Sequence, residues 1–480
     1  MNTKTKLLSF AFLKRQREIE RYHTDAEIIQ QNQLFHLLGA ARATEWGEKY
    51  AYHTIESYDQ FAKRVPLQTY EEIKPYVERM LRGEQNLIWP TEVRWFAKSS
   101  GTTNDKSKFI PVSQEALKEC HYQGGWDTVA LYLQQNPESN FFSGKALILG
   151  GSHKPDELAP GIHYGDLSAV LIQNINPLLE FIRVPGKEIA LMSEWEAKLE
   201  AMVQSTSKEN ITNLSGVPSW FLVLIKKILD REGKKSLLDV WPNLEVFFHG
   251  GISFDPYREQ YKQLIPSDKM HYMETYNASE GFFGIQNDMA DRSMLLMIDL
   301  GIFFEFIPLE EIDQPQPTVV PLWKTEVNKN YAVVISTNSG LWRYIIGDTV
   351  KFTSVNPYKF VITGRTKHFI NAFGEELMVA NAEKGIARAC EATGAIVTDY
   401  TAAPTFMSEN KKGHHTWIIE FEKEPASLES FADILDQSLQ ELNSDYEAKR
   451  YKGLFLSRLE LIKARKDLFH DWLKEKGKLG

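Results

Sequence analysis

Four short segments of the chain carry residues that could bind a nucleotide. The first is Phe96–Ser113, FAKSSGTTNDKSKFIPVS, in which five small residues stand in a row between apolar stretches: Ser99, Ser100, Gly101, Thr102 and Thr103. Their hydroxyls and backbone amides can surround phosphate oxygens, and glycine lets the backbone approach closely. Lys106 or Lys108 would add positive charge. The P-loop pattern GxxxxGK[ST] is absent, so a phosphate site here belongs to another fold, and a solvated β-turn is the alternative interpretation.

The other three segments place charged side chains near predicted strand ends. Glu280 in TYNASEGFFG follows a strand and a turn, and beside a triphosphate its carboxylate could hold Mg²⁺. Asp348 in RYIIGD is predicted at a strand end, where a carboxylate can accept two hydrogen bonds from a ribose diol. Arg365 and Lys367 in GRTK are predicted at a domain junction. Each of these residues alone also suits an ordinary loop, but their order along the chain favours a nucleotide site.

The elements that would position these residues are predicted to form an α/β domain. The segment before residue 90 has helical periodicity, with Thr69 and Glu72 forming a capping box before EEIKPYVERML. Ser193 and Glu196 are predicted to form a second box before WEAKLEAMV. From Lys145 on, KALILGG, LEVFFHGG, MHYMETY, YAVVIST and KFVITGR are short apolar runs typical of buried strands. Ligands of open α/β sheets bind at loops that leave strand ends, and we predict such loops at FFHGG, ETYNASEG and YIIGDT.

After Arg365 the pattern changes to a smaller α+β unit. Helices are predicted at EELMVANAEKGIARACEATG, SLESFADILDQSLQELNSDYEAKR and KDLFHDWLKEKG, and strands at AIVTDYTA, HTWIIEFE and GLFLSRLELI. We therefore predict two domains, residues 1–365 and residues 366–480.

The composition narrows the class of protein. The chain has 480 residues and a net charge of −9, which argues against a nucleic-acid partner. Its two cysteines, Cys120 and Cys390, lack the spacing of metal ligands and favour a reducing compartment. The N-terminal segment reads as an amphipathic helix and not a signal peptide, and no apolar run reaches the roughly 18 residues of a membrane span. We expect a cytoplasmic protein without membrane partners, a monomer or weak homodimer.

The ordered motifs resemble the adenylate-forming superfamily, and the individual strings resemble its GH3 branch, the acyl acid amido synthetases, in a bacterial-type form. SSGTTNDKSKFIPV is similar to the phosphate loop of that family, YNASEG to its Tyr-x-x-Ser-Glu motif, and YIIGD to its Tyr-x-x-Gly-Asp motif. The resemblance extends from PLQTYEEIKPYVERM to WLKEKGKLG. It implies a large N-terminal α/β adenylating domain with buried sheets, which holds the nucleotide and acyl acid site, and a smaller, mobile C-terminal α+β domain.

The resemblance also implies a reaction in two steps. A carboxylic acid attacks the α-phosphate of ATP to give acyl-AMP and pyrophosphate, and an amino acid amine then displaces AMP to form an amide. Lys108 and Mg²⁺ on Glu280 would offset the charge that develops on pyrophosphate, so both residues are expected to be catalytic. Asp348 and Arg365 would hold the ribose. The remaining nucleotide-binding residues that the resemblance implies are Ser99, Ser100, Gly101, Thr102, Thr103, Gly250, Gly251, Tyr276 and Ser279.

Three further expectations follow from the resemblance. The candidates for the acyl pocket are Val217, Phe221, Leu222, Phe282 and Phe283, whereas the stripe of Trp220, Val223, Leu224 and Ile228 reads as core. Lys367 stands where the superfamily has its hinge residue. Related chains continue with a basic segment that brings a lysine to the phosphates, whereas this chain ends at Gly480, so either that lysine is missing or Lys474, Lys476 or Lys478 substitutes for it. A CoA ligase with the same first step, and a nucleotide-binding regulatory protein without catalysis, remain the alternatives.

Overall fold

A computed structural model describes residues 3–99, 108–150, 156–251, 253–366, 369–370, 377–405, 413–443, 446–447, 450 and 456–476. The chain divides into two compact units. Unit 1 comprises residues 1–251 and 265–361, together with residue 480, and unit 2 comprises residues 252–264 and 362–479. The predicted boundary after residue 365 stays a prediction. No helix in the described part of the chain is long and apolar enough to cross a membrane.

Unit 1 is built on a mixed sheet of twelve strands. Five strands at one end run parallel: β6 (Arg183–Val184), β3 (Lys145–Ile148), β7 (Ile211–Gly216), β8 (Val246–His249) and β9 (His271–Ala278). The sheet continues, with antiparallel pairing wherever the register is described, through β10 (Gly281–Ile285), β11 (Met294–Leu296), β16 (Tyr358–Arg365), β15 (Tyr344–Val355), β14 (Asn330–Thr337), β12 (Ile302–Pro308) and β13 (Val320–Pro321). The predicted α/β fold is confirmed.

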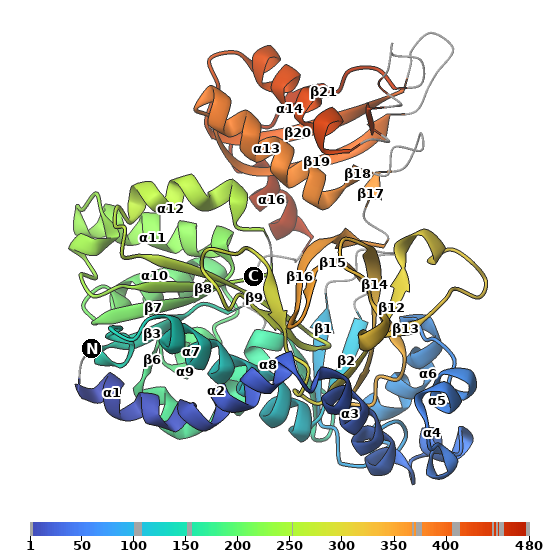
Figure 1. The fold of residues 1–480 in the computed structure, drawn as a ribbon. Coiled ribbons are helices and arrows are strands. Elements are labelled where there is room, and N and C mark those ends of the chain that lie inside the picture. The colour runs from blue at the N-terminus through green and yellow to red at the C-terminus, as the bar shows by residue number, and fades with distance from the viewer. Residues whose placement is uncertain are drawn as a thin grey trace. The chain divides into compact units, whose positions relative to one another are not determined.

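Helices cover the parallel strands on both faces, as the apolar runs of buried strands require. On one side lie α10 (Trp195–Thr206) and α11 (Pro218–Glu232), and on the other lie α7 (Gln123–Gln135) and α8 (Leu167–Asn174) (Figure 1). A π-helical segment, η4 (Ala116–Tyr122), leads directly into α7. The short α9 (Lys187–Ala190) follows β6.

The predicted helical N-terminal segment is confirmed. Its α-helices are α1 (Thr3–Ser9), α2 (Leu13–Glu20), α3 (Ala26–Ala41), α4 (Glu45–Lys49), α5 (Tyr58–Arg64) and α6 (Tyr70–Leu81). The capping box before α6 is present, since the Glu72 carboxylate accepts a hydrogen bond from the Thr69 backbone N–H at 2.5 Å. The second predicted box is wrong, because α10 begins one residue later than the pattern suggested. Glu194 is its N-cap, and the Glu194 carboxylate accepts from the backbone N–H groups of Glu196 and Ala197.

A second, four-stranded sheet of unit 1 carries the ends of the predicted phosphate loop. Its order is β2 (Lys108–Val112), β1 (Trp95–Ser99), β5 (Ile162–Gly165) and β4 (Asp156–Ala159). Strands β1 and β2 pair antiparallel, with Ser99 opposite Lys108. The chain between these two residues therefore connects adjacent, oppositely directed strands.

Unit 2 has its own sheet and its own core. The sheet consists of β19 (Ile396–Thr405), β20 (His414–Lys423) and β21 (Glu460–Lys463), and β17 (Phe369–Ile370) pairs with β18 (Leu377–Met378). The helices are α12 (Arg258–Leu264), α13 (Val379–Thr393), α14 (Leu428–Leu442) and α16 (Leu468–Glu475). Trp417 and Ile419 of β20 are buried against Ile386 of α13 and Leu435 of α14. The smaller α+β unit that the sequence predicts is present.

Candidate functional site

The two tyrosine motifs meet in unit 1 through a hydrogen bond. The Tyr276 hydroxyl donates to Oδ2 of Asp348. Tyr276 is on β9 and Asp348 is on β15, so strands distant in the sequence bring the two side chains together. The prediction of a loop at Asp348 is wrong, because the residue lies inside β15.

A bulge in β15 explains how a residue within a strand reaches the site. Val334 pairs with Ile345 and Ala332 pairs with Thr349, so three residues of β15 lie opposite the single residue Val333. Gly347 within this bulge has φ of +90°, a conformation that favours glycine. Bulges redirect side chains out of the ladder. The Gly-Asp pair therefore turns the Asp348 carboxylate toward Tyr276.

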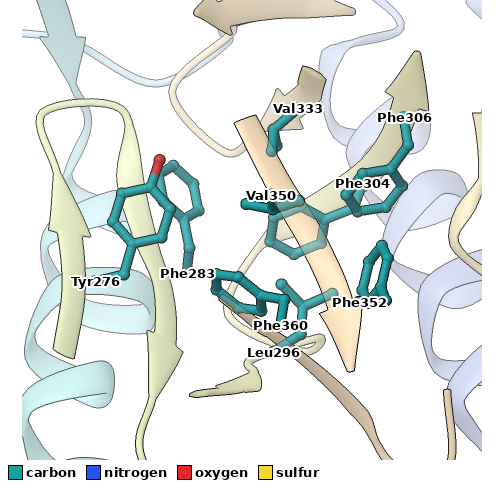
Figure 2. A pocket seen from close by; sticks show the side chains of 9 residues that line it. All are labelled: Tyr276, Phe283, Leu296, Phe304, Phe306, Val333, Val350, Phe352 and Phe360. Atoms are coloured by element: carbon teal, nitrogen blue, oxygen red, sulfur yellow. The ribbon is translucent and has the colours of Figure 1, made fainter. Parts of the chain in front are cut away.

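The ring of Tyr276 is anchored in an aromatic cluster of the antiparallel strands. Figure 2 shows this cluster, which consists of Tyr276, Phe283, Leu296, Phe304, Phe306, Val333, Val350, Phe352 and Phe360. The Tyr276 ring packs at 4.8 Å from the Phe283 ring, centroid to centroid, and is 8% exposed. The free space among these side chains is about 10 Å³, which is room for no more than one water molecule. The cluster is core, and it fixes the direction in which the Tyr276 hydroxyl points.

Glu280 and Ser279 form the two-residue turn of a hairpin. Strand β9 extends to Ala278, which pairs with Gly281 of β10. The predicted loop ETYNASEG is therefore mostly strand. The Glu280 side chain is partly buried at the tip of the hairpin. Mg²⁺ is commonly held by one or two carboxylates together with substrate phosphates, so a single carboxylate at a strand end fits this ion. Among the described residues, no group of three or more His, Cys, Asp or Glu side chains could hold a metal.

Gly250 and Gly251 follow β8 directly and bring its end close to β9. A Cβ atom on Gly250 would lie 2.3 Å from the carbonyl oxygen of Thr275, and Gly251 has φ of +81°. The Thr275 hydroxyl donates to the carbonyl of His249 at 3.3 Å. A larger residue at Gly250 would push the two strand ends apart, whereas at Gly251 the positive φ itself disfavours any side chain.

A cavity of about 540 Å³ opens between the parallel strands and the helices α7 and α8. This volume is typical of sites for small molecules. Its apolar walls come from Tyr122, Trp126, Val129, Phe141, Phe142, Ile148, Leu149, Leu167, Leu171, Ile172, Ile175, Leu179, Ile182, Val217, Trp220, Phe248 and Phe282. At the carboxyl ends of the strands it is bordered by Gly250, Gly251, Thr275 and Asn277. We call this end the mouth of the cavity.

Of the residues predicted for an acyl pocket, Val217 and Phe282 line this cavity. Phe221 is fully buried and packs against Phe247 at 5.1 Å between ring centroids. Leu222 is buried, and Phe283 belongs to the aromatic cluster. These three are not among the described residues that line the cavity.

Trp220, which the sequence placed in the core, lines the cavity instead. The N-cap residue Val217 and Trp220 in the first turn of α11 line the cavity, whereas Phe221 packs against Phe247 of the sheet. Apolar periodicity alone cannot tell which face of a helix a cavity adjoins.

His121 is a further cavity residue that the sequence analysis did not single out. Its Nδ1 donates to Oδ1 of Asn277 at 2.9 Å, and the side chain is 4% exposed. Burial lowers the pKa of His121 from 6.5 to about 4, so the imidazole is neutral at pH 7. Thr275 and Asn277 flank Tyr276 on β9. The alternation of side chains along a strand could have identified both residues once Tyr276 was assigned.

The remaining residues predicted for the nucleotide site or the hinge either lie away from the cavity or fall outside the described part of the chain. The Lys108 ammonium lies 5.6 Å from the centre of the Tyr70 ring. Arg365 is the exposed last residue of β16. Outside the described residues lie Ser100, Gly101, Thr102, Thr103 and Lys367.

The fold is that of adenylate-forming ligases. The structure of 2-hydroxyisobutyryl-CoA ligase in its post-adenylation state aligns with a TM-score of 0.58 and 14% identity, over 96% of this chain and 92% of that one. The GH3.15 acyl acid amido synthetase in complex with 2,4-DB aligns with a TM-score of 0.81 and 20% identity, over 97% of this chain and 91% of that one.

The family follows from matches along the whole sequence. The GH3 family N-terminal domain matches residues 15–270, the central domain residues 295–365 and the C-terminal domain residues 380–480. The chain therefore belongs to the GH3 family. Similar relatives include the 4-substituted benzoates-glutamate ligase GH3.12 of Arabidopsis thaliana, which is 24% identical over 95% of this chain and 91% of its own length. The jasmonoyl-L-amino acid synthetase JAR4 of Nicotiana attenuata is 23% identical over 94% of this chain and 89% of its own length.

Proposed function

We propose that this protein is an ATP-dependent acyl acid amido synthetase, which activates a carboxylic acid as acyl-AMP and transfers the acyl group to the amine of an amino acid. One observation carries the proposal. The strand ends that border the mouth of the apolar cavity, Gly250–Gly251 and Thr275–Asn277, include Tyr276, which holds Asp348. An acid in the cavity and a nucleotide at Asp348 would therefore meet at one edge of the sheet.

The roles of the nucleotide-binding residues follow from this arrangement. Asp348, whose orientation the Tyr276 hydroxyl fixes, accepts hydrogen bonds from the ribose. Gly250 and Gly251 border the adenine, and Gly250 lets the end of β8 approach Thr275 closely because it has no side chain. Ser99 and the small residues after it cradle the β- and γ-phosphates between β1 and β2, and Lys108 adds positive charge there.

Mg²⁺ on Glu280 would supply positive charge that stabilises the departing pyrophosphate. Tyr276 and Phe283 keep the β9–β10 hairpin in place, so the Glu280 carboxylate is held at the strand end before the nucleotide arrives. Preorganised charge of this kind costs no rearrangement during the reaction.

The cavity takes the acyl part of the acid. Val217, Trp220 and Phe282 form its walls near the mouth, in agreement with an apolar acid whose carboxylate points toward Thr275 and Asn277. The neutral His121 imidazole holds Asn277 and brings no positive charge that would pair with the carboxylate. The cytoplasm suits the protein, because Cys120 and Cys390 are free thiols.

The test is acid-dependent exchange of pyrophosphate into ATP, followed by product analysis with amino acids or with CoA. An amide with an amino acid is the expected product. A thioester as the only product would identify a CoA ligase, and absence of exchange with every acid tested would indicate nucleotide binding without catalysis.

A further inference from the structure

Two buried polar side chains lie at the end of the cavity opposite its mouth. Arg183 of β6 and Asn213 of β7 are each the register partner of Ala146 on β3. Residues at the same level of neighbouring strands share a face of the sheet, and all three residues line the cavity. The alanine side chain between them is short and leaves space above the sheet. We call Arg183, Ala146 and Asn213 the floor of the cavity.

Two N–H groups of the Arg183 guanidinium have no acceptor among the described residues. It is 3% exposed, donates to Oε1 of Glu180 from Nε at 3.1 Å and from Nη2 at 2.5 Å, and donates from Nη1 to the Pro185 carbonyl at 3.0 Å. These bonds use three of the five guanidinium N–H groups, and the described residues supply no acceptor for the other two. Buried hydrogen-bond donors almost always have an acceptor in proteins. We therefore expect the two remaining N–H groups of Arg183 to donate to a molecule bound in the cavity.

Asn213 adds an acceptor at the same level. It is 3% exposed, and its Nδ2 donates to Oγ1 of Thr212 at 3.1 Å. Within the described part of the chain, its Oδ1 accepts no hydrogen bond. The floor therefore offers donors and an acceptor below walls that are apolar.

The distance from floor to mouth follows from strand geometry. The floor lies at Asn213 on β7, and the mouth lies just beyond the strand's end, at the level of Val217. Four residues of strand at about 3.3 Å each give a separation of about 13 Å.

We propose that the acid bound by this protein carries an uncharged oxygen group, a hydroxyl or a ketone, at its end remote from the carboxylate, and that Arg183 and Asn213 bind this oxygen. The inference rests on the proposed function, because it takes the mouth as the place where the carboxylate is activated. A hydroxyl can accept from Arg183 and donate to Asn213. An uncharged group is favoured over a second carboxylate, because Glu180 at 2.5 Å already balances the charge of Arg183.

The experiment compares pairs of acids of equal length. Binding of ω-hydroxy fatty acids and of the unsubstituted fatty acids, spanning about eight to fourteen carbons, is measured by calorimetry with the full-length protein. The native protein is expected to bind the hydroxylated member about tenfold to hundredfold more tightly at the best length, as for one hydrogen bond to a charged donor. Arg183→Met should remove this preference while the unsubstituted acid still binds, and Asn213→Leu should reduce it.

Two further variants serve as controls. Ile148→Val trims the apolar wall without touching a hydrogen bond, so it should keep the preference. The double variant Arg183→Met with Glu180→Gln leaves no carboxylate unpaired. If it folds normally, it should lose the preference for the hydroxylated acid to the same extent as Arg183→Met. Melting temperatures of all variants are recorded in parallel.

Equal dissociation constants for both members at every length would overturn the inference, as would a preference that persists in Arg183→Met, or no binding of any of these acids. Pyrophosphate exchange on the same samples separates this inference from the proposed function. Tighter binding of the hydroxylated acids without pyrophosphate exchange would refute the ligase activity, and the role of Arg183 and Asn213 in binding the oxygen would still hold. Pyrophosphate exchange without a preference for the hydroxylated acids would refute that role, and the ligase activity would still hold.

Discussion

His121 makes the stability of this protein depend on pH in a way that can be worked out from its surroundings. The imidazole is buried in η4, its Nδ1 donates to Asn277, and burial lowers its pKa from 6.5 to about 4. The unfolded chain therefore binds a proton between these pH values and the folded chain does not. The stabilisation is fully present above about pH 6.5 and is lost as the pH falls toward about 4.

The magnitude follows from the two pKa values. At about 1.4 kcal/mol per pH unit, the full difference corresponds to on the order of 3 kcal/mol of folding free energy. About 2 kcal/mol of this is lost between roughly pH 7.5 and pH 5, because at pH 5 the unfolded imidazole is almost fully protonated and the folded one is still mostly neutral.

The assay is urea unfolding of native protein and of His121→Gln at these two pH values, followed by tryptophan fluorescence. Glutamine retains a hydrogen bond to Asn277 but cannot take up a proton, so the variant should lose about 2 kcal/mol less than the native protein on acidification. His36→Gln, at an exposed position of α3, is the matched control and should keep the native pH dependence. Equal pH dependence of the native protein and His121→Gln would refute the reasoning.

Three predictions concern the proposed reaction. Glu280→Gln should lower the rate of pyrophosphate exchange by about 10²-fold with little change in melting temperature, since a metal ligand at a hairpin tip is lost; near-native turnover at saturating Mg²⁺ would remove Glu280 from the site. Asp348→Ala should raise the KM for ATP about tenfold to hundredfold, because an acceptor for the ribose is lost; equal use of ATP and 2′-deoxy-ATP by the native enzyme would contradict the ribose role. Lys367→Pro, which fixes φ near −65°, should impair amide formation more than pyrophosphate exchange if the chain pivots there; a parallel fall in both rates, or no fall in either, would speak against a hinge at this residue.

Features that depend on residues close together in the chain could largely be predicted from the sequence. The capping box of Thr69 and Glu72 is a contact between residues three apart, so it forms wherever that helix forms. The apolar runs from Lys145 onward form strands, and those at Val246–His249 and Asn330–Thr337 are buried almost throughout, because apolar side chains leave water whatever their partners are. The ordered motifs identified the family, which the domain matches confirm. The sequence pattern placed the start of α10 one residue too early, and it therefore assigned the N-cap to Ser193, whereas the N-cap is Glu194.

Which side chains share the site depends on contacts between segments that are far apart in the sequence. Asp348 faces Tyr276 because of a bulge in the pairing of β15 with β14. The motif YIIGD does not predict which strand β15 pairs with. Trp220 lines the cavity while Phe221 does not, because the sheet fixes which side of α11 is already covered. Arg183 and Asn213 are thirty residues apart in sequence, yet strand β3 places them on one floor. Contacts between distant segments depend on strand order and register, and these are set by the packing of the whole unit and not by any local pattern.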